Sequence, residues 1–574
     1  MSKHDMDVAS SVEFPVTVKE VRSGSISSDD EAPFRPDAQL KLAFSALVVL
    51  TFMVAMNSTA LAVAIPTIAA DLNGSALETF WAGTGFLLTE AIFMAPLGRL
   101  SDVMGRVPVL NFSTGLFLAG TIVSSAAPSL TILIFGRAVQ GAGGGGIAVL
   151  LEIVVTDLVP LQVRGTYFSV ISALWTLGDV AGPILGGWVA SRASWRWIFW
   201  SNIPVAIVGL VLTNLFIHLR PVPGTYSEKC KQVDWIGMAV SVAAFTSLLI
   251  GITWGGVLYA WDSPSTIVPI VMGLVGIGLF VVCEKYVVSE PLIRFELLGS
   301  YNMIYALFAA FFHTVLVLGL IYVLPLYFEA VQRCESLQAA LSMIPYGITL
   351  APFSALAGLA ISRTGNISWV LRAGWALAIL GSGLLVLLDA STAAWRSALI
   401  IACCGAGLGL LYNALILLAQ ASLDECHAAF AVTVLNHVRY LGQAVGVAVV
   451  GVVFQNRMGA TMRADPELAP SAAEYASDAA ALIQKLKVLQ EGPFKDKVIG
   501  AYADALRTIW IAMCALCVLP FLGSFFLSRL DMGRSHRAAQ GPRDDDRFGS
   551  DDSSRSEVRY NSCDVAIPEC NVSL

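Results

Sequence analysis

Nine residues from Gly98 to Arg106 concentrate charge between two long apolar runs. Their sequence, Gly-Arg-Leu-Ser-Asp-Val-Met-Gly-Arg, holds two arginines, one aspartate and two glycines, the second of which is Gly105. If the apolar runs cross a membrane, these charges must lie at the water boundary, because each would be costly in hydrocarbon. Asp102 can pair with Arg106, and it lies near the start of the following helix, where negative charge is favoured. A short charged connection of this kind could lock or release its neighbours.

The composition indicates that the apolar runs do cross a membrane. Of the 574 residues, 56% are hydrophobic and only 13% are charged, and the mean hydropathy is +0.71. Soluble proteins carry roughly 25% charged residues. The apolar residues come in blocks of about 20, which is long enough to span a bilayer as helices, and no alternation typical of an outer-membrane barrel is visible. The sequence therefore predicts an all-α polytopic membrane protein.

We expect fourteen transmembrane helices in a six, two, six arrangement. The first six are expected near residues 41–65, 79–97, 108–126, 131–153, 167–190 and 197–219. Two more are expected near 235–254 and 265–285, and the last six near 302–326, 338–360, 369–388, 396–419, 432–453 and 506–528. Two similar halves with a site between them are typical of secondary transporters.

Domain boundaries follow from these spans. We expect a disordered cytosolic tail at 1–40, a six-helix bundle at 41–219, a cytosolic linker at 220–234, two additional helices at 235–285, a second six-helix bundle at 286–528 with a long extracellular loop at 454–505, and a disordered cytosolic tail at 529–574. Both tails are acidic and rich in serine, which is typical of disordered segments. An alanine-rich amphipathic stretch near 471–490 predicts a surface helix in the extracellular loop.

The distribution of lysine and arginine sets the orientation, because short cytoplasmic loops carry an excess of both. With the N-terminus inside, the expected outer loops at 66–78, 127–130 and 255–264 contain neither residue, although four arginines are exceptions: Arg192, Arg196, Arg333 and Arg396. Both tails are therefore expected in the cytosol, and we expect the plasma membrane, with the vacuolar membrane as the alternative. Asn73 lies in an expected outer loop and is a candidate for glycosylation.

Five segments, in order along the chain, resemble the sequence motifs of the major facilitator superfamily. The segment from Gly98 to Arg106 resembles its loop signature, and Arg137-Ala-Val-Gln140-Gly141-Ala-Gly143 resembles its fourth-helix motif. The run Gly178-Asp-Val-Ala-Gly182-Pro183-Ile-Leu-Gly186-Gly187 resembles the fifth-helix motif associated with antiporters. Two further segments, 195–204 and Arg439-Tyr-Leu-Gly442-Gln443-Ala-Val-Gly446, resemble the fourteen-helix drug:proton antiporter branch of fungal type. The resemblance covers about residues 41–528.

The resemblance implies roles for these motifs. It implies that Gly98, Asp102, Gly105 and Arg106 form a charged gate, for which Asp157 at the expected cytosolic end of the fourth helix is a second acidic partner; plain membrane topology also explains the arginines. It implies a role for Arg137, and with it Gln140, in proton coupling or substrate contact. Because a central arginine is costly in a membrane, Arg137 should face a polar cavity, and snorkelling to the outer interface is the alternative.

Glycines in the fifth helix allow a neighbouring helix to approach closely. Gly178, Gly182 and Gly186 recur every four residues on one face, and Pro183 permits a bend. That face could seal the cavity against leak, as the antiporter motif implies, but helix packing alone explains the glycines equally well. Asp179 in the same span is a membrane carboxylate.

One departure from the branch concerns proton coupling. The branch usually has an acidic residue in the first helix, but here the run is Met-Asn57-Ser-Thr, and an asparagine cannot take up a proton. If coupling persists, a buried carboxylate must carry it. Our first choice is Glu90, with Glu152 and Asp179 as the other candidates; Glu90 could instead be a paired structural acid.

These observations predict a secondary active exporter of amphiphilic small molecules, such as a fungal metabolite, toxin or drug, driven by proton antiport with alternating access. The alternatives are an uptake or vacuolar carrier, for example of a siderophore or an amino acid, and a nontransporting membrane sensor. We expect a monomer that contacts its substrate and the lipid bilayer, with no nucleic acid, nucleotide, metal or other cofactor, and we do not expect an enzyme.

Overall fold

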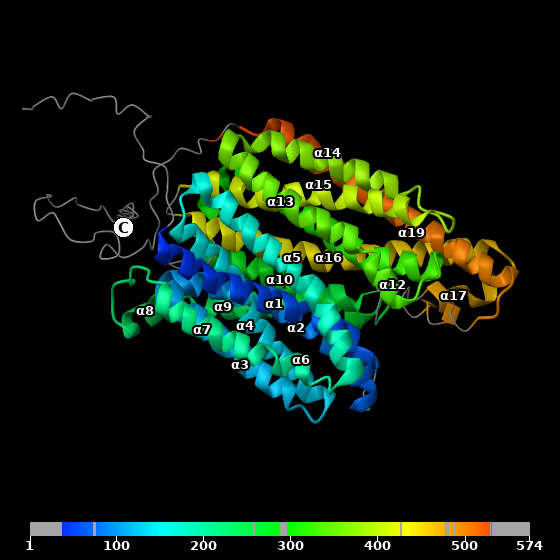
Figure 1. Ribbon diagram of the computed structural model, residues 1–574, viewed down its shortest axis with the longest axis horizontal. Coiled ribbons are helices and arrows are strands. Elements are labelled where there is room, and N and C mark those ends of the chain that lie inside the picture. The colour runs from blue at the N-terminus through cyan, green and yellow to red at the C-terminus, as the bar shows by residue number, and fades with distance from the viewer. Residues whose placement is uncertain are drawn as a thin grey trace, which may run out of the picture. The chain divides into compact units, whose positions relative to one another are not determined.

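We describe a computed structural model of the chain. It describes residues 37–72, 76–255, 259–286, 295–424, 427–476, 482–483, 485–486, 489–528 and 530. The candidate glycosylation site Asn73 and both tails, 1–36 and 531–574, lie outside the described residues. Helices dominate the described part of the chain, as the sequence predicts (Figure 1).

The first helices form an N-terminal group. They are α1 (Ala38–Asp71), α2 (Ala76–Met104), α3 (Arg106–Ser125), α4 (Leu130–Leu158), α5 (Leu161–Arg192), α6 (Trp197–Trp200) and α7 (Asn202–Phe216). Within this group α1 packs on α5, and α4 packs on both α2 and α3.

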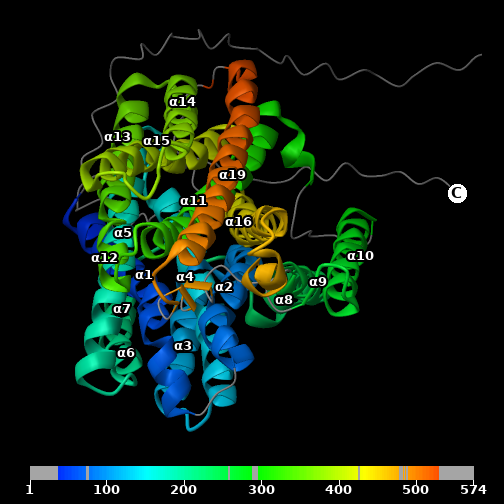
Figure 2. The same ribbon diagram turned by 90° about the vertical axis from the view of Figure 1, so that its right-hand side faces the viewer.

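A linker and two further helices follow. The short helix α8 (Tyr226–Gln232) lies in the linker, and α9 (Trp235–Trp254) pairs with α10 (Pro264–Tyr286). Figure 2 shows α9 and α10 at the side of the other helices, where α9 contacts α2 and α16. The outward face of α10 exposes apolar side chains such as Val268, Met272 and Leu274, as expected for a helix that faces lipid.

The remaining helices form a C-terminal group. It comprises η1 (Phe295–Gly299), α11 (Tyr301–Leu326), η2 (Tyr327–Val331), α12 (Ser336–Leu341), α13 (Ile344–Thr364), α14 (Ile367–Leu385), α15 (Ala394–Ala421), α16 (Ala428–Ala464), η4 (Ala469–Ser471), α17 (Ala472–Ala476), α19 (Pro493–Gly523) and η5 (Ser524–Phe526). Here α15 packs on α13 and α14, and α11 packs on α16. In Figure 1 α13, α14 and α15 of this group lie in the upper part of the view, and α3 and α6 of the N-terminal group lie in the lower part.

Fourteen helical segments of the described chain have at least 18 residues when α6 and α7 are taken together as Trp197–Phe216. Eleven of them are long and apolar enough to cross a membrane. The other three, α2, α5 and α16, are also long enough and alternate with them along the chain. The all-α polytopic membrane fold is therefore confirmed, and the number of long helices equals the number of spans expected.

Two connections between helices differ most from those expected. The charged segment after Gly98 is helical up to Met104, so the connection between α2 and α3 is Gly105 alone, whose φ of 103° favours glycine. The expected extracellular loop at 454–505 is shorter, because α16 continues to Ala464 and α19 already begins at Pro493. Ion pairs such as Arg457–Asp504 hold these polar extensions together, which hydropathy does not reveal.

The two ends of the helices can be told apart by their connections. We call one end the hinge end; it carries Gly105 and the first residues of α5 and α14. We call the opposite end, which carries Asp71 and Arg333, the far end. Contacts between the N-terminal and C-terminal groups are made by α5 with α13 and α15, and by α2 and α4 with α16.

Candidate functional site

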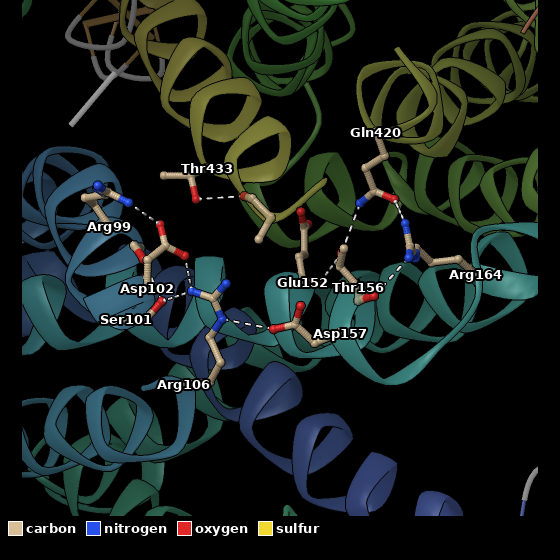
Figure 3. A network of polar contacts seen from close by, with 12 residues as sticks. Arg99, Ser101, Asp102, Arg106, Glu152, Thr156, Asp157, Arg164, Gln420 and Thr433 are labelled. Atoms are coloured by element: carbon tan, nitrogen blue, oxygen red, sulfur yellow. Dashed lines mark hydrogen bonds and ion pairs between the residues drawn. The ribbon is translucent and has the colours of Figure 1, made fainter. Parts of the chain in front are cut away.

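An ion-pair network formed by Arg99, Asp102, Arg106 and Asp157 lies at the hinge end (Figure 3). Arg106 is fully buried. Its Nε donates to Asp157 at 3.0 Å, its Nη1 donates to the Ser101 hydroxyl at 2.7 Å, and it also pairs with Asp102. Asp102 accepts a further hydrogen bond from Arg99 at 3.3 Å. The predicted pairing of Arg106 with both acids is therefore present, and it fixes α2, α3 and α4 to one another.

The network also adjoins the C-terminal group. A Cβ atom on Gly98 would lie 2.8 Å from the methyl group of Thr433 on α16. Only a residue without a side chain permits this approach, which brings α2 directly against α16. Gly98 therefore serves contact between the two groups of helices rather than a turn.

Hydrogen bonds join the two groups a short way from this network. Arg164 at the start of α5 donates from Nη1 to the side-chain oxygen of Gln420 on α15 at 2.8 Å. Gln420 in turn donates to the Thr156 hydroxyl of α4 at 3.1 Å. Arg164 is held in place by bonds to the backbone oxygens of Val159 and Thr156. All three polar side chains are buried, so their bonds are shielded from water.

The backbones of α5 and α13 also approach each other closely at the hinge end. A Cβ atom on Gly358 would lie 2.3 Å from the backbone oxygen of Gly165. One turn deeper, Ser169 donates to the Ala355 backbone oxygen at 3.2 Å and Ser172 donates to Asn413 at 3.2 Å. The hinge end is therefore closed by tight packing as well as by polar bonds.

One face of α16 carries two buried acid contacts. Asn436 and Tyr440 are four residues apart and so share one side of the helix. Asn436 Nδ2 donates to Glu152 Oε2 of α4 at 2.8 Å, and the Tyr440 hydroxyl donates to Glu90 Oε1 of α2 at 3.5 Å. Both carboxylates are buried. Two of the predicted coupling candidates thus lie where the N-terminal and C-terminal groups meet.

The polar cluster inside the N-terminal group is centred on Arg137. Its Nη1 donates to Gln140 at 2.8 Å, and its guanidinium lies 4.3 Å from the ring of Phe86. Gln140 then donates to Thr121 at 2.7 Å and to Asn57 at 3.2 Å. Arg137 is fully buried, so the alternative that it snorkels to the interface is wrong.

Asn57 takes part in this cluster as an acceptor. Its Oδ1 accepts from Gln140 and, at 3.3 Å, from Asn202. The amide therefore takes the acceptor position that a carboxylate would fill, without its charge and without the ability to bind a proton. The acid that acts electrostatically on Arg137 is Glu90.

The glycine motif of α5 lets a neighbouring helix approach closely, as predicted, and that helix is α1. Added Cβ atoms at Gly178, Gly182 and Gly186 would approach α1 atoms to 2.7, 2.1 and 2.0 Å. Asp179 lies beside this face, within hydrogen-bonding reach of Ser58. Pro183 and Gly187 lie in the same helix, and their side-chain surroundings are outside the described part of the structure.

The C-terminal motif has a corresponding role on α16. Added Cβ atoms at Gly442 and Gly446 would lie 2.4 Å from Thr314 and 2.6 Å from the Val315 backbone oxygen, so both glycines let α11 approach. Arg439 points to α15, where its Nη2 donates to the Tyr412 backbone oxygen at 2.6 Å. Gln443 is half-buried on the same helix.

Several residues of the site escaped sequence analysis. Gln420, Asn413, Asn436, Thr433 and Tyr440 all bridge the two groups of helices, yet none was singled out. Isolated amides inside apolar runs such as 394–421 could have been a signal, because polar residues inside a membrane are costly. Among the described residues, no cluster of three or more His, Cys, Asp or Glu side chains could hold a metal ion.

Two groups of membrane helices that meet through polar contacts at one end are an arrangement typical of secondary transporters. The sequence model of the Major Facilitator Superfamily matches residues 47–447, and the chain belongs to that superfamily. The chain is 40% identical to MFS transporter L2 of Phoma sp. over 89% of this chain and 85% of the relative. It is 32% identical to efflux pump FUS6 of Gibberella fujikuroi, over 88% and 92%.

Solved structures agree with this fold. The proton:xylose symporter XylE superposes with a TM-score of 0.54 at 13% identity, covering 86% of this chain and 97% of XylE. The human organic anion transporter MFSD10 gives a TM-score of 0.51 at 15% identity, covering 85% and 100%. The family assignment and the fungal efflux-pump relatives confirm the resemblance found in the sequence.

Proposed function

We propose that this transporter exports amphiphilic small molecules by proton antiport, with the hinge end facing the cytosol. The observation that carries the proposal is the position of the contacts between the two groups of helices. The hydrogen bonds of Arg164, Ser172 and Asn436 to the opposite group all lie in the hinge-end half of the helices. Such a state is closed to one side of the membrane, as alternating access requires.

The direction of transport rests on two observations. Two relatives, FUS6 and MMF1, are named as efflux pumps. MMF1 of Mycosarcoma maydis is 31% identical over 88% of this chain and 82% of the relative. The hinge end also carries Arg99, Arg106 and Arg164, as the cytosolic side of a membrane protein does. The names support export, and the arginines support a cytosolic hinge end; with that end closed, an exported molecule would leave to the outside.

Glu90 is the proton carrier in this proposal. It is buried, it acts on Arg137, and its partner Tyr440 belongs to the opposite group of helices. A carboxylate whose partner leaves when the groups separate changes its proton affinity with each transport cycle. Asn57 cannot do this, and Asp179 on α5 has its hydrogen-bonding partner, Ser58, within the same group of helices.

The hinge network is the gate in this proposal. Arg106 links α3 to both α2 and α4, and Gly98 sets α2 against Thr433. Movement of α16 away from Gly98 would therefore be transmitted to the ion pairs of Arg106. The gate would control which side is open, whereas substrate selectivity would lie deeper in the membrane.

The proposal also covers the organisation of the chain. The N-terminal and C-terminal groups are the two rocking bundles, α9 and α10 are additional helices, and the segments before α1 and after α19 are cytosolic tails. The protein works as a monomer in the plasma membrane, uses the proton gradient and requires no cofactor or nucleotide. The substrate class is an amphiphilic metabolite, toxin or drug.

Transport by purified protein tests the proposal. We expect proteoliposomes to concentrate the lipophilic dye rhodamine 6G, or a retained metabolite from cells lacking the protein, when a pH gradient is imposed, and to stop when the gradient is dissipated. Equilibration that ignores the pH gradient would contradict antiport. Movement in the opposite direction would favour an uptake carrier, and no movement of any compound would favour a sensor.

Replacing Glu90 tests the carrier assignment separately. Glu90→Gln keeps the size of the side chain and its hydrogen bond from Tyr440, but it cannot bind a proton. We expect it to abolish the dependence of transport on the pH gradient. Glu335→Gln, which changes an exposed acid at the far end, is the matched control. Unchanged coupling in Glu90→Gln would contradict the assignment.

A further inference from the structure

A groove lies at the far end of the N-terminal group, over the segment 195–204, which takes no part in the hinge network or in the contacts between the two groups. The groove has a volume of about 510 Å³. It is lined by Ser194, Arg196, Trp197, Trp200, Ile203 and Pro204. These residues belong to the connection after α5, to α6 and to the first turn of α7. The segment therefore forms a surface whose use the transport cycle does not explain.

Two tryptophans form exposed walls of the groove. Trp197 is 58% exposed and Trp200 is 46% exposed. Tryptophan is enriched where the headgroups of a bilayer meet its hydrocarbon, because its ring is apolar and its N–H is polar. Further exposed apolar side chains follow on the same side of α7, at Ile207, Val211 and Leu215. The groove is therefore placed at the headgroup edge of an apolar face that lies against lipid.

Arg196 is held at the polar edge of the groove. Its guanidinium lies 4.3 Å from the ring of Trp195, and it donates to Asp71 at 3.4 Å and to the Ala127 backbone oxygen at 3.0 Å. A guanidinium has five N–H donors, and these two bonds leave donors for a further acceptor. The hydroxyl of Ser194 lies beside it and accepts the backbone N–H of Arg196 at 3.4 Å. The arrangement thus offers a fixed cation and a hydroxyl to a ligand.

An acid lies next to this cation. The side chain of Asp71 is 52% exposed, and its Oδ2 accepts from both Arg196 and the Trp195 ring nitrogen. A purely anionic group in the groove would meet the charge of Asp71, and a purely cationic group would meet that of Arg196. A group that carries one charge of each sign a short distance apart satisfies both residues.

A phosphocholine headgroup has this pattern of charges. Its phosphate can accept charge-assisted hydrogen bonds from Arg196 and a bond from the Ser194 hydroxyl. Aromatic faces recognise quaternary ammonium groups, and Trp197 and Trp200 offer such faces. The ammonium of an ethanolamine headgroup is compact and strongly hydrated, and a glycerol headgroup carries no cation. The acyl chains would continue along the exposed apolar face of α7.

We propose that this groove binds one phosphatidylcholine molecule of the outer leaflet, with its phosphate on Arg196 and Ser194 and its trimethylammonium group against Trp197 and Trp200. The choice of leaflet rests on the orientation proposed above, whereas binding itself depends neither on that orientation nor on transport. Arg196 already ties the end of α1, through Asp71, to the segment after α3, through Ala127. The bound lipid adds a membrane contact to this junction.

Native mass spectrometry of the full-length protein tests the site. Delipidated protein in detergent is titrated with dioleoyl-phosphatidylcholine, dioleoyl-phosphatidylethanolamine or dioleoyl-phosphatidylglycerol, and the bound lipids are counted at each concentration. We expect one phosphatidylcholine to bind about tenfold more tightly than either other lipid, because only its headgroup uses both the tryptophan faces and Arg196.

Substitutions separate the two parts of the headgroup. Trp197→Ala and Trp200→Ala should each weaken phosphatidylcholine binding about threefold to fivefold and leave phosphatidylglycerol binding unchanged. Arg196→Gln should weaken binding of all three lipids about tenfold, because each has a phosphate. Arg196→Lys keeps the positive charge and should retain most of the binding. It therefore separates loss of the phosphate contact from damage to the junction with Asp71.

A matched pair on the other group of helices is the control. Trp395 is 63% exposed at the far-end start of α15, and Arg396 lies 5.4 Å from its ring. Trp395→Ala and Arg396→Gln should leave phosphatidylcholine binding unchanged.

Three outcomes would overturn the proposal. They are equal binding of the three lipids, equal losses in the groove variants and the control variants, which would indicate adventitious annular lipid only, and a dimer that disappears in Trp197→Ala, which would place a second copy of the chain in the groove. Loss of proton antiport with intact phosphatidylcholine binding would contradict the proposed function alone.

Discussion

Polar side chains are used differently at the two ends of the helices. At the hinge end they join the two groups: Arg164 reaches Gln420, and Asn436 reaches Glu152. At the far end the ion pairs of the described residues stay within one group, as in the pair of Arg196 with Asp71. Buried polar contacts between the two groups of helices are therefore concentrated at the hinge end. At the far end, each group is stabilised by its own ion pairs.

The two ends also differ in burial. Arg106 and Asp157 are 1% and 3% exposed, whereas Arg196 and Asp71 are 33% and 52% exposed. Exposed ion pairs contribute little, because water and salt screen them, but breaking a buried pair leaves an uncompensated charge. Substitutions at the hinge end should therefore have much larger effects than matched substitutions at the far end.

The largest effect is expected from a side chain placed between the two groups. In Gly358→Val the new Cβ would lie 2.3 Å from the Gly165 backbone oxygen, and a backbone atom cannot rotate away. We expect the hinge end to stay open and transport to fall at least about tenfold, in line with the usual cost of overpacking. Gly115→Val is the control, because no atom lies within 4 Å of its Cβ; equal loss in both variants would contradict the argument.

The next effect should come from the buried ion pair. Asp157→Ala leaves Arg106 with Asp102 and Ser101, and we expect a loss of about 3 kcal/mol in the free energy of unfolding. Asp71→Ala, which removes the exposed partner of Arg196 at the far end, should cost about 1 kcal/mol or less. Thermal unfolding of both variants in the same detergent checks the difference. Equal losses would show that the two ends do not differ.

The fold of this chain could be predicted from its sequence because its dominant signal is local. A run such as 264–286 is apolar over the thickness of a bilayer, and no other structure satisfies its backbone there. The ends of α16 and α19 could not be found in this way, because Arg457 and Asp504 stabilise polar helical extensions through each other. Hydropathy assigns both to a loop.

The site was predictable in part. Asp157 was expected as a partner of Arg106, because both residues lie at helix ends that were predicted to face the cytosol. Gln420 and Asn436 were not, because their partners Arg164 and Glu152 are more than 250 positions away in the chain. Nothing within one helix shows which distant helix its polar residue will face.

A smaller effect is expected from one of these distant partners. Gln420→Ala removes the acceptor of Arg164 and the donor to Thr156 without opening a gap between backbones. Hydrogen bonds to charged groups contribute about 1.5–3 kcal/mol, and Arg164 retains its backbone acceptors, so we expect about a tenfold rise in the open population of the hinge end. Hydrogen–deuterium exchange of residues 161–172 measures this open population. Unchanged exchange would show that Gln420 does not help to hold the two groups of helices together.

The smallest effect is expected at the far end. Glu491 accepts hydrogen bonds from Arg333 at 3.0 Å and Lys495 at 2.7 Å. The bond from Lys495, with the nearby charge of Arg333, lowers the pKa of Glu491 below its ordinary value of 4.5. Its contribution is thus complete above pH 4.5 and is lost as the pH falls through the lowered pKa. Because the site is exposed, we expect Glu491→Gln to change the folding equilibrium about twofold or less.

Unfolding temperatures of wild type and Glu491→Gln should therefore differ slightly at pH 7 and converge below pH 4. Transport by Glu491→Gln should equal that of the wild type, because the interactions of Arg333 and Lys495 lie within the C-terminal group and do not change when the two groups separate. A large loss of transport would mean that the far end also carries contacts that govern the transport cycle, and the asymmetry between the two ends would no longer hold.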